Sequence, residues 1–181
     1  MSSTIKSTID QQIPSDVVVI KHSKFEDNRG FLNCLAESMT NDQFSGWSLK
    51  MSRSKVNVAR GIHWQRPDAP QEKVITLLRG IILDVLVNLD PNSQQFGRAY
   101  RFHMNADEGV TLVIPPHYGH GFLALTDTDF LYLCKGKYSS QSELSVGIFD
   151  YLKDVISAQE IILSKKDAQA LTFQELASSI K

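Results

Sequence analysis

Four polar side chains that could act on an anionic substrate lie between residues 60 and 73: Arg60, His63, Gln65 and Lys73. An arginine can bind a phosphate or carboxylate through two parallel hydrogen bonds, an imidazole can take up and release protons near neutral pH, and a lysine can stabilise a developing oxyanion. These residue types predict removal of a proton from a carbon beside a carbonyl group. Taken alone, however, the segment favours a polar hairpin with solvated charges and a hydrogen-bonded histidine, so the rest of the chain has to decide.

A second group of histidines, in the sequence IPPHYGHGF at residues 114–122, raises the question of a metal site. Metal sites in small barrels typically use a His-x-His pair with an acid and a later histidine. Here the first pair is His63-x-Gln65, and an amide oxygen is a poorer ligand for transition metals than imidazole. We therefore predict no metal in the site, and we interpret His117 as a loop histidine bonded to the backbone.

The composition excludes several classes of protein. A chain of 181 residues with a net charge of −1 is long enough for one buried core and has no overall positive field for nucleic acid. Cys34 and Cys134 lie far apart in the sequence, which is typical of proteins from a reducing compartment. No stretch reaches the roughly 18 apolar residues of a membrane span, and residues 1–16 are polar. We expect a single-domain cytoplasmic protein that binds neither nucleic acid nor a membrane.

Short β-type runs separated by turn residues dominate the chain up to about residue 154. They predict strands at 16–20, 24–25, 31–32, 47–54, 99–104 and 110–114. Residues 73–89 predict a strand pair joined at Arg79-Gly80, and residues 121–134 predict a hairpin around the turn at 126–129. Residues 41–44 could form a short helical turn, and residues 1–14 a loosely held arm. From Asp154 onward the composition predicts a helical tail, with helices at 164–170 and 172–180.

Many short strands followed by one helical tail predict an all-β fold, either an antiparallel sandwich or a barrel, and specifically a jelly roll. In such a fold, side chains that alternate along facing strands line one mouth of the barrel. His63, Lys73, His120 and Tyr132 could meet there if they lie on facing strands.

Several motifs, taken in order, resemble the dTDP-4-dehydrorhamnose 3,5-epimerase family over nearly the whole chain. They are RGIHWQ at 60–65, Lys73, RGIILDV at 79–85, FG at 96–97, IPPHYGHGF at 114–122, FLYL at 130–133, Tyr138, and LSKKD at 163–167. The resemblance implies a cupin-type jelly roll, a homodimer that exchanges N-terminal strands, and a reaction without a metal or organic cofactor. It also implies a nucleoside diphosphate 4-keto-6-deoxy sugar as the substrate.

The resemblance also implies roles for individual residues. His63 matches the family's catalytic base, Asp167 the carboxylate that orients it, Lys73 the cation beside the C4 oxygen, and Tyr132 the acid on the opposite face of the sugar. The positions that match substrate contacts are Arg29, Arg60, Gln65, His120, Tyr138, Glu143 and Lys166.

The chain departs from the family pattern at several positions. Cys34 stands where the family usually has Glu. Ser48 and Lys50 stand where the family has a Gln-x-Asn that contacts the nucleotide base of the substrate. The Trp-x-Pro segment expected after Asp150 is absent.

Other functions remain alternatives. The same catalytic base, His63, and the same cation, Lys73, would also serve an epimerase that inverts only C3 or only C5, or a ketoisomerase. A cupin that binds sugar nucleotides without catalysis is the alternative from another class.

Overall fold

Two five-stranded antiparallel sheets form the body of the protein in the computed structural model, which describes residues 13–21, 24–27, 30–33 and 47–180. The first sheet has the order β1 (Val18–Lys21), β9 (Val110–Ile114), β6 (Glu72–Arg79), β11 (Thr128–Lys135), β4 (Trp47–Ser54). The second has the order β12 (Glu143–Ser145), β5 (Ala59–Gln65), β10 (Tyr118–Ala124), β7 (Ile81–Asn88), β8 (Ala99–Asn105). A separate pair is made by β2 (Lys24–Asp27) and β3 (Gly30–Asn33). The predicted all-β, cupin-type jelly roll is confirmed.

The core between the sheets is built from the inward side chains of both. Ile75 and Phe130 come from the first sheet, and Leu86 and Phe122 come from the second, all in one buried cluster. The rings of Phe122 and Phe130 stack with centroids 4.8 Å apart, so they join the sheets directly. Both rings also line the cavity between the sheets.

Two predicted strand pairings are wrong, although the strands themselves exist. Residues 73–89 form β6 and β7, and residues 118–135 form β10 and β11, but in each case the two strands belong to different sheets. Their hydrogen-bonding partners are distant in sequence: β6 pairs with β9 and β11, whereas β7 pairs with β8 and β10. The turns at Gly80 and at 125–127 therefore carry the chain from one sheet to the other, as a jelly roll requires.

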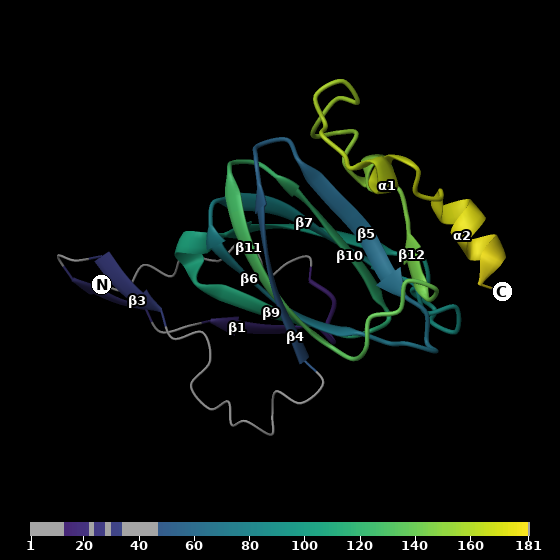
Figure 1. Ribbon diagram of the computed structural model, residues 1–181, viewed down its shortest axis with the longest axis horizontal. Helices are drawn as coiled ribbons and strands as arrows, with labels where there is room; N and C mark the ends of the chain where they lie inside the picture. The colour runs from purple at the N-terminus through teal and green to yellow at the C-terminus, as the bar shows by residue number, and fades with distance from the viewer. Residues whose placement is uncertain (1–12, 22–23, 28–29, 34–46, 181) are drawn as a thin grey trace.

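The C-terminal segment covers the outer face of the second sheet. Its helices are α1 (Lys165–Ala168), capped by Ser164, and α2 (Phe173–Ser179), capped by Thr172, close to the predicted positions. Residues 154–163 form turns rather than the expected helix. Leu152 and Leu176 pack into a second buried cluster against that sheet. Figure 1 shows α1 and α2 beside β5 and β12, so the tail brings α1 next to the strand that carries His63.

The remaining short elements among the described residues are the 3₁₀ turns η2 (Ala106–Glu108) and η3 (Phe149–Tyr151). Most of the arm expected at 1–14, the helical turn at 41–44 and the predicted site residue Arg29 lie outside the described residues, as does Cys34. Among the described residues, no helix is long and apolar enough to cross a membrane.

Candidate active site

A cavity of about 280 Å³ opens between the two sheets and is lined from both of them and from the C-terminal segment. Nine of the residues predicted for the site line it: His63, Lys73, Tyr132, Asp167, Arg60, His120, Tyr138, Glu143 and Lys166. They come from five strands, the loop that follows β11, and α1. The structure therefore brings together side chains separated by up to about a hundred positions in sequence.

A bulge in β5 turns two of these side chains toward the cavity. In a regular strand, residues three apart point to opposite faces, yet both Arg60 and His63 line the cavity. On the neighbouring β10, His120 pairs with His63 and Phe122 with Arg60, so β5 has one extra residue in this interval. Gly61, with φ of 92°, makes the bulge possible, because a Cβ there would lie 2.6 Å from the backbone oxygen of His120.

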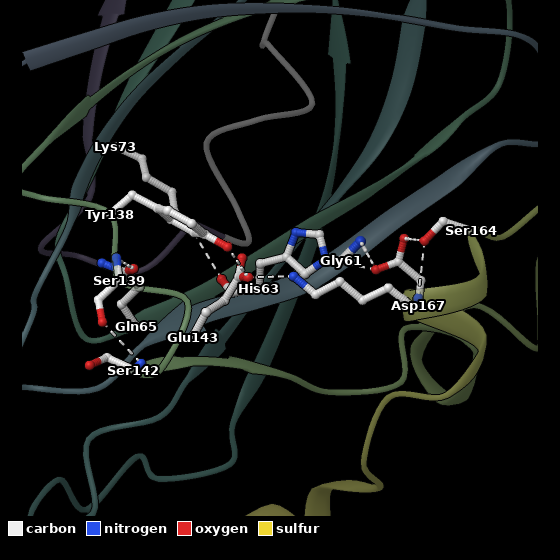
Figure 2. A network of polar contacts seen from close by, with 11 residues as sticks. Gly61, His63, Gln65, Lys73, Tyr138, Ser139, Ser142, Glu143, Ser164 and Asp167 are labelled. Atoms are coloured by element: carbon white, nitrogen blue, oxygen red, sulfur yellow. Dashed lines mark hydrogen bonds and ion pairs between the residues drawn. The ribbon is translucent and has the colours of Figure 1, made fainter.

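His63 is paired with Asp167 across the junction of β5 and α1. Its Nε2 lies 2.7 Å from Asp167 Oδ1, and the other carboxylate oxygen accepts a hydrogen bond from Ser164 Oγ at 2.7 Å (Figure 2). Burial alone would raise the pKa of the Asp167 carboxyl, but the hydrogen bonds from His63 and Ser164 hold it below its ordinary value. An ionised Asp167 accepts a hydrogen bond from Nε2–H of His63, which leaves Nδ1 as the basic nitrogen of the ring.

Lys73 reaches from β6 in the first sheet toward β5 in the second. Its Nζ donates to the backbone oxygen of His63 at 2.8 Å, which fixes the ammonium beside the histidine. Burial lowers the pKa of Lys73 to about 8. The group is therefore a cation at neutral pH, and it is more acidic than a solvated lysine.

Tyr132 faces His63 from the opposite sheet, since it lies on the inward side of β11. No described residue forms a hydrogen bond with its hydroxyl group. Burial raises the pKa of the Tyr132 phenol, and the positive charge of Arg60 opposes that rise in part. The phenol is thus protonated at neutral pH and open to the cavity.

Three of the predicted substrate-binding residues form a network at the other side of His63. Tyr138 Oη donates to Glu143 Oε2 at 2.8 Å, and Lys166 contacts the same carboxylate oxygen. Burial favours a higher pKa for Glu143, but the hydrogen bonds from Lys166 and Tyr138 lower it below its ordinary value. An ionised Glu143 can therefore hold the Tyr138 ring and the Lys166 ammonium at the cavity rim.

Gln65 is placed differently from its predicted role in substrate binding. It is buried but does not line the cavity, and its whole amide group is used by the backbone. Its Nε2 donates to the oxygens of Ala69 and Lys137, and its Oε1 accepts from the nitrogen of Ser139. Gln65 thus fastens the loop that carries Tyr138, which explains why a buried amide occurs in this strand.

Asp84 is a site residue that the sequence analysis missed. It is fully buried on β7, and its Oδ1 lies 2.8 Å from Nε2 of His120, while its Oδ2 has no hydrogen-bond partner among the described residues. This gives the cavity a second histidine–carboxylate pair, with the His120 ring stacked on Phe130. An aspartate inside the apolar run IILDVLV was the available signal, because an acidic residue in a central strand needs a partner.

Arg60 lies at the exposed edge of the cavity. Its Nε donates to Ser54 Oγ at 2.9 Å and its Nη2 to the backbone oxygen of Arg53, which leaves other guanidinium protons for a ligand. Arg29, the other predicted arginine, lies outside the described residues. No group of three or more histidine, cysteine, aspartate or glutamate side chains gathers to hold a metal ion within the described part of the chain.

The fold and the cavity define a class: a cupin-type jelly roll whose central cavity holds a paired histidine, a buried lysine and an open tyrosine. Comparison with known proteins agrees with this class. The family model for dTDP-4-dehydrorhamnose 3,5-epimerase matches residues 11–175. The chain belongs to that family, and it is therefore an epimerase, an enzyme of the isomerase class.

Individual relatives give the same result. The dTDP-4-dehydrorhamnose 3,5-epimerase of Escherichia coli strain K12 is 32% identical over 89% of this chain and 91% of its own length. The crystal structure of the enzyme of that name from Sulfolobus tokodaii has a TM-score of 0.77 at 30% identity, covering 91% of this chain and 94% of the other. That of a dTDP-6-deoxy-D-glucose-3,5-epimerase from Legionella pneumophila, in complex with dTDP-4-keto-L-rhamnose, has a TM-score of 0.72 at 28% identity, covering 88% and 91%.

Proposed function

We propose that this protein inverts a nucleoside diphosphate 4-keto-6-deoxy sugar at C3, C5 or both, by removing and returning a proton beside the C4 ketone. The observation that carries the proposal is the placement of His63 and Tyr132 on opposite sheets, with the cavity between them. Inversion of a carbon centre requires that the proton leave from one face and return to the other. Two proton-transfer groups on facing walls meet that requirement.

His63 is the proposed base. Its Nδ1 takes the proton from the carbon beside the ketone, and the electron pair of the C–H bond moves into the carbonyl to give an enolate. The imidazolium that results is stabilised by Asp167, which is already ionised and lies 2.7 Å from Nε2. Asp167 therefore acts by orienting the ring and raising its basicity, not by accepting the substrate proton.

Lys73 is the proposed stabiliser of the enolate oxygen. A cation fixed by its bond to the His63 backbone costs little reorganisation when negative charge develops nearby. Because burial has lowered its pKa to about 8, the ammonium also donates a stronger hydrogen bond to an enolate than a solvated lysine would. The base and the cation act on the same ketone, so both should be needed for proton removal.

Tyr132 is the proposed acid. Its O–H bond breaks as the proton passes to the carbon from the second face, the enolate returns to the ketone, and a tyrosinate remains. One proton from His63 to solvent and one from solvent to Tyr132 restore the starting state. The overall reaction consumes no oxidant, reductant or cofactor.

The rest of the cavity suits a sugar nucleotide. Arg60 can bind the diphosphate with its free guanidinium protons. Tyr138 presents a half-exposed ring on which the nucleotide base of the substrate could stack. His120 and the Glu143–Lys166 pair supply hydrogen bonds to sugar hydroxyls. The bound dTDP-4-keto-L-rhamnose in the Legionella relative supports a substrate of this class. Arg29 keeps its proposed role in phosphate binding.

A homodimer is the proposed assembly. The outer face of the first sheet carries a continuous apolar row in register across all five strands: Leu49, Leu133, Val74, Val113 and Val18. Leu49 and its strand neighbour Met51 are 66% and 56% exposed. An apolar sheet face of this extent is typical of an interface, and a second copy would cover it with an identical face. The exchange of N-terminal strands stays a prediction.

The direct test is incubation with a panel of nucleoside diphosphate 4-keto-6-deoxy sugars in deuterated water. We expect deuterium at C3, C5 or both, with inverted product at the same positions. Inversion at one carbon alone would favour the single-position epimerase, and a ketone moved to another carbon would favour a ketoisomerase. Tight binding without any exchange would identify a non-catalytic sugar-nucleotide-binding cupin and would overturn the proposal.

A further inference from the structure

A lysine that departs from the family pattern lies over both tyrosines of the cavity. Lys50 is on β4, where it is the Cα partner of Tyr132 on β11. Its Nζ is 5.8 Å from the centre of the Tyr132 ring and 5.7 Å from the centre of the Tyr138 ring. The position is usually an asparagine in the family that this chain resembles, so the cavity has gained a full positive charge beside the proposed acid.

Four lysine and arginine side chains line the described part of the cavity, and Lys50 differs from the other three in having no polar partner among the described residues. Lys73 donates to the His63 backbone, Lys166 contacts Glu143, and Arg60 donates to Ser54 and Arg53. Within the described part of the chain, no hydrogen bond or ion pair engages the Lys50 ammonium, which lies over the two rings and near enough to Lys73 for its charge to help lower the pKa of that lysine. Its charge is therefore available to an anion that forms in the cavity.

We propose that Lys50 is a positioning residue that stabilises the tyrosinate formed when Tyr132 gives its proton to the sugar carbon. The inference rests on the proposed function, in which Tyr132 is the acid of the second proton transfer. A tyrosinate spreads its negative charge into the ring, which is the part of Tyr132 that faces the Lys50 ammonium. The attraction is therefore stronger after proton transfer than before it, and a difference of this kind lowers the barrier.

The surroundings of Tyr132 explain why such help is needed. Burial disfavours the charged form of the phenol, and the nearby Cys134 thiol acts in the same direction, whereas the guanidinium of Arg60 favours the charged form. Lys73 lies on β6, which flanks β11 on the side opposite to β4, and its proposed role is to stabilise the enolate. The carboxylates of the cavity, Glu143 and Asp167, come from the other side and are already paired. Among the residues that the structure describes, Lys50 is thus the cation without a polar partner next to the acid.

Coulomb's law gives the size of the effect. At a separation near 6 Å, an ammonium and a tyrosinate attract by about 1 to 3 kcal/mol at effective dielectric constants between those of water and a protein surface. About half of this difference acts in the transition state of a proton transfer. Loss of the charge should therefore slow the return of the proton by about 3- to 10-fold.

The first experiment compares Lys50→Met with the charge-retaining Lys50→Arg, using the ratio of inversion to solvent exchange. Removal of the substrate proton by His63 and its return to the same face give exchange without inversion, while inversion needs Tyr132. Both reactions use Lys73, so their ratio cancels any effect of Lys50 on that neighbour. We expect the ratio to fall about 3- to 10-fold in Lys50→Met and to return toward that of the unmodified protein in Lys50→Arg.

Lys135→Met is the matched control. Lys135 lies on the same strand pair, and its Nζ is 5.6 Å from the ring centre of its Cα partner Trp47, but it is outside the cavity. Its loss removes an equivalent cation–ring contact and should leave the ratio unchanged. A similar fall in both variants would assign the effect to the strand pair and would overturn the role of Lys50.

The second readout follows Tyr132 itself. In protein carrying ¹³Cζ-tyrosine, the Tyr132 signal is assigned from its loss in Tyr132→Phe, and its titration midpoint should move upward in Lys50→Met. An unchanged midpoint and ratio, in a protein that exchanges and inverts its substrate, would refute this inference alone. A raised KM with an unchanged ratio would make Lys50 a diphosphate contact instead. Failure of the unmodified protein to exchange at all would refute the proposed function.

Discussion

The lysine beside the proposed base should set the upper pH limit of the reaction. In the proposed mechanism Lys73 stabilises the enolate only as an ammonium, and burial has lowered its pKa from the ordinary value of 10.5 to about 8. A lowered pKa means that the cation persists below pH 8 and is lost as the pH rises above it. About nine-tenths of the molecules would carry the charge at pH 7 and about one-tenth at pH 9.

The expected result is a kcat/KM that is flat around pH 7 and falls about tenfold per pH unit above roughly pH 8.5. Tyr132 cannot cause this fall, because burial raises its pKa above the ordinary value of 10.0. The assay is the initial rate of product formation, or of deuterium uptake, across pH 6 to 10 with a 4-keto-6-deoxy sugar nucleotide.

Lys73→Arg provides the control. A guanidinium remains charged throughout this range, so the variant should be slower, since its geometry differs, but should lose the fall above pH 8. Lys73→Met, which has a similar stem and no charge, should lose about 10²- to 10³-fold in rate at pH 7. The reasoning would be refuted by a wild-type rate that stays constant up to pH 10, or by the same fall persisting in Lys73→Arg.

Three further outcomes are expected. Asp167→Asn replaces the ionised partner of His63 with a neutral one. Loss of this charge-assisted hydrogen bond should lower kcat/KM roughly 10- to 100-fold at pH 7, with a smaller change in KM. An unaltered rate would remove Asp167 from the mechanism. Because His63-x-Gln65 breaks the usual ligand pair, activity should survive exhaustive treatment with chelators, and rescue of a chelated, inactive protein by one divalent metal would contradict this. Placing lysines at Leu49 and Met51 should convert the proposed dimer to monomers in light scattering after size-exclusion chromatography, whereas a monomeric unmodified protein at micromolar concentration would argue against the interface.

The strands were predictable from the sequence because each depends on local pattern. The alternation in WSLKMSRS and the β-branched run before Pro115 mark β4 and β9 within a residue or two. Strand pairing was not predictable in the same way. The polar sequence at 126–129 suits a hairpin, but in this fold the turn at 125–127 joins two sheets, and the distant pairing partners of β10 and β11 reveal this.

The composition of the site could be predicted only in part. His63 and Lys73 lie ten residues apart, and their chemistry is visible locally. By contrast, the partnership of His63 with Asp167 spans 104 positions and was available only through the family resemblance. Spacing also misleads at β5, because the bulge at Gly61 places Arg60 and His63 on one face. At Gln65 the residue type was not enough to predict the partner. The side-chain amide was expected to bind the substrate, but the structure shows that it binds backbone groups.

The most direct test of the account compares the two walls of the cavity in one exchange experiment. His63→Ala and Tyr132→Phe are each incubated with a nucleoside diphosphate 4-keto-6-deoxy sugar in deuterated water, and deuterium uptake and inverted product are measured by NMR. With the proposed base and the proposed acid on opposite sheets, Tyr132→Phe should still incorporate deuterium while forming little inverted product, and His63→Ala should lose both. Near-normal exchange in His63→Ala, or normal inversion in Tyr132→Phe, would contradict the assignment of the two faces.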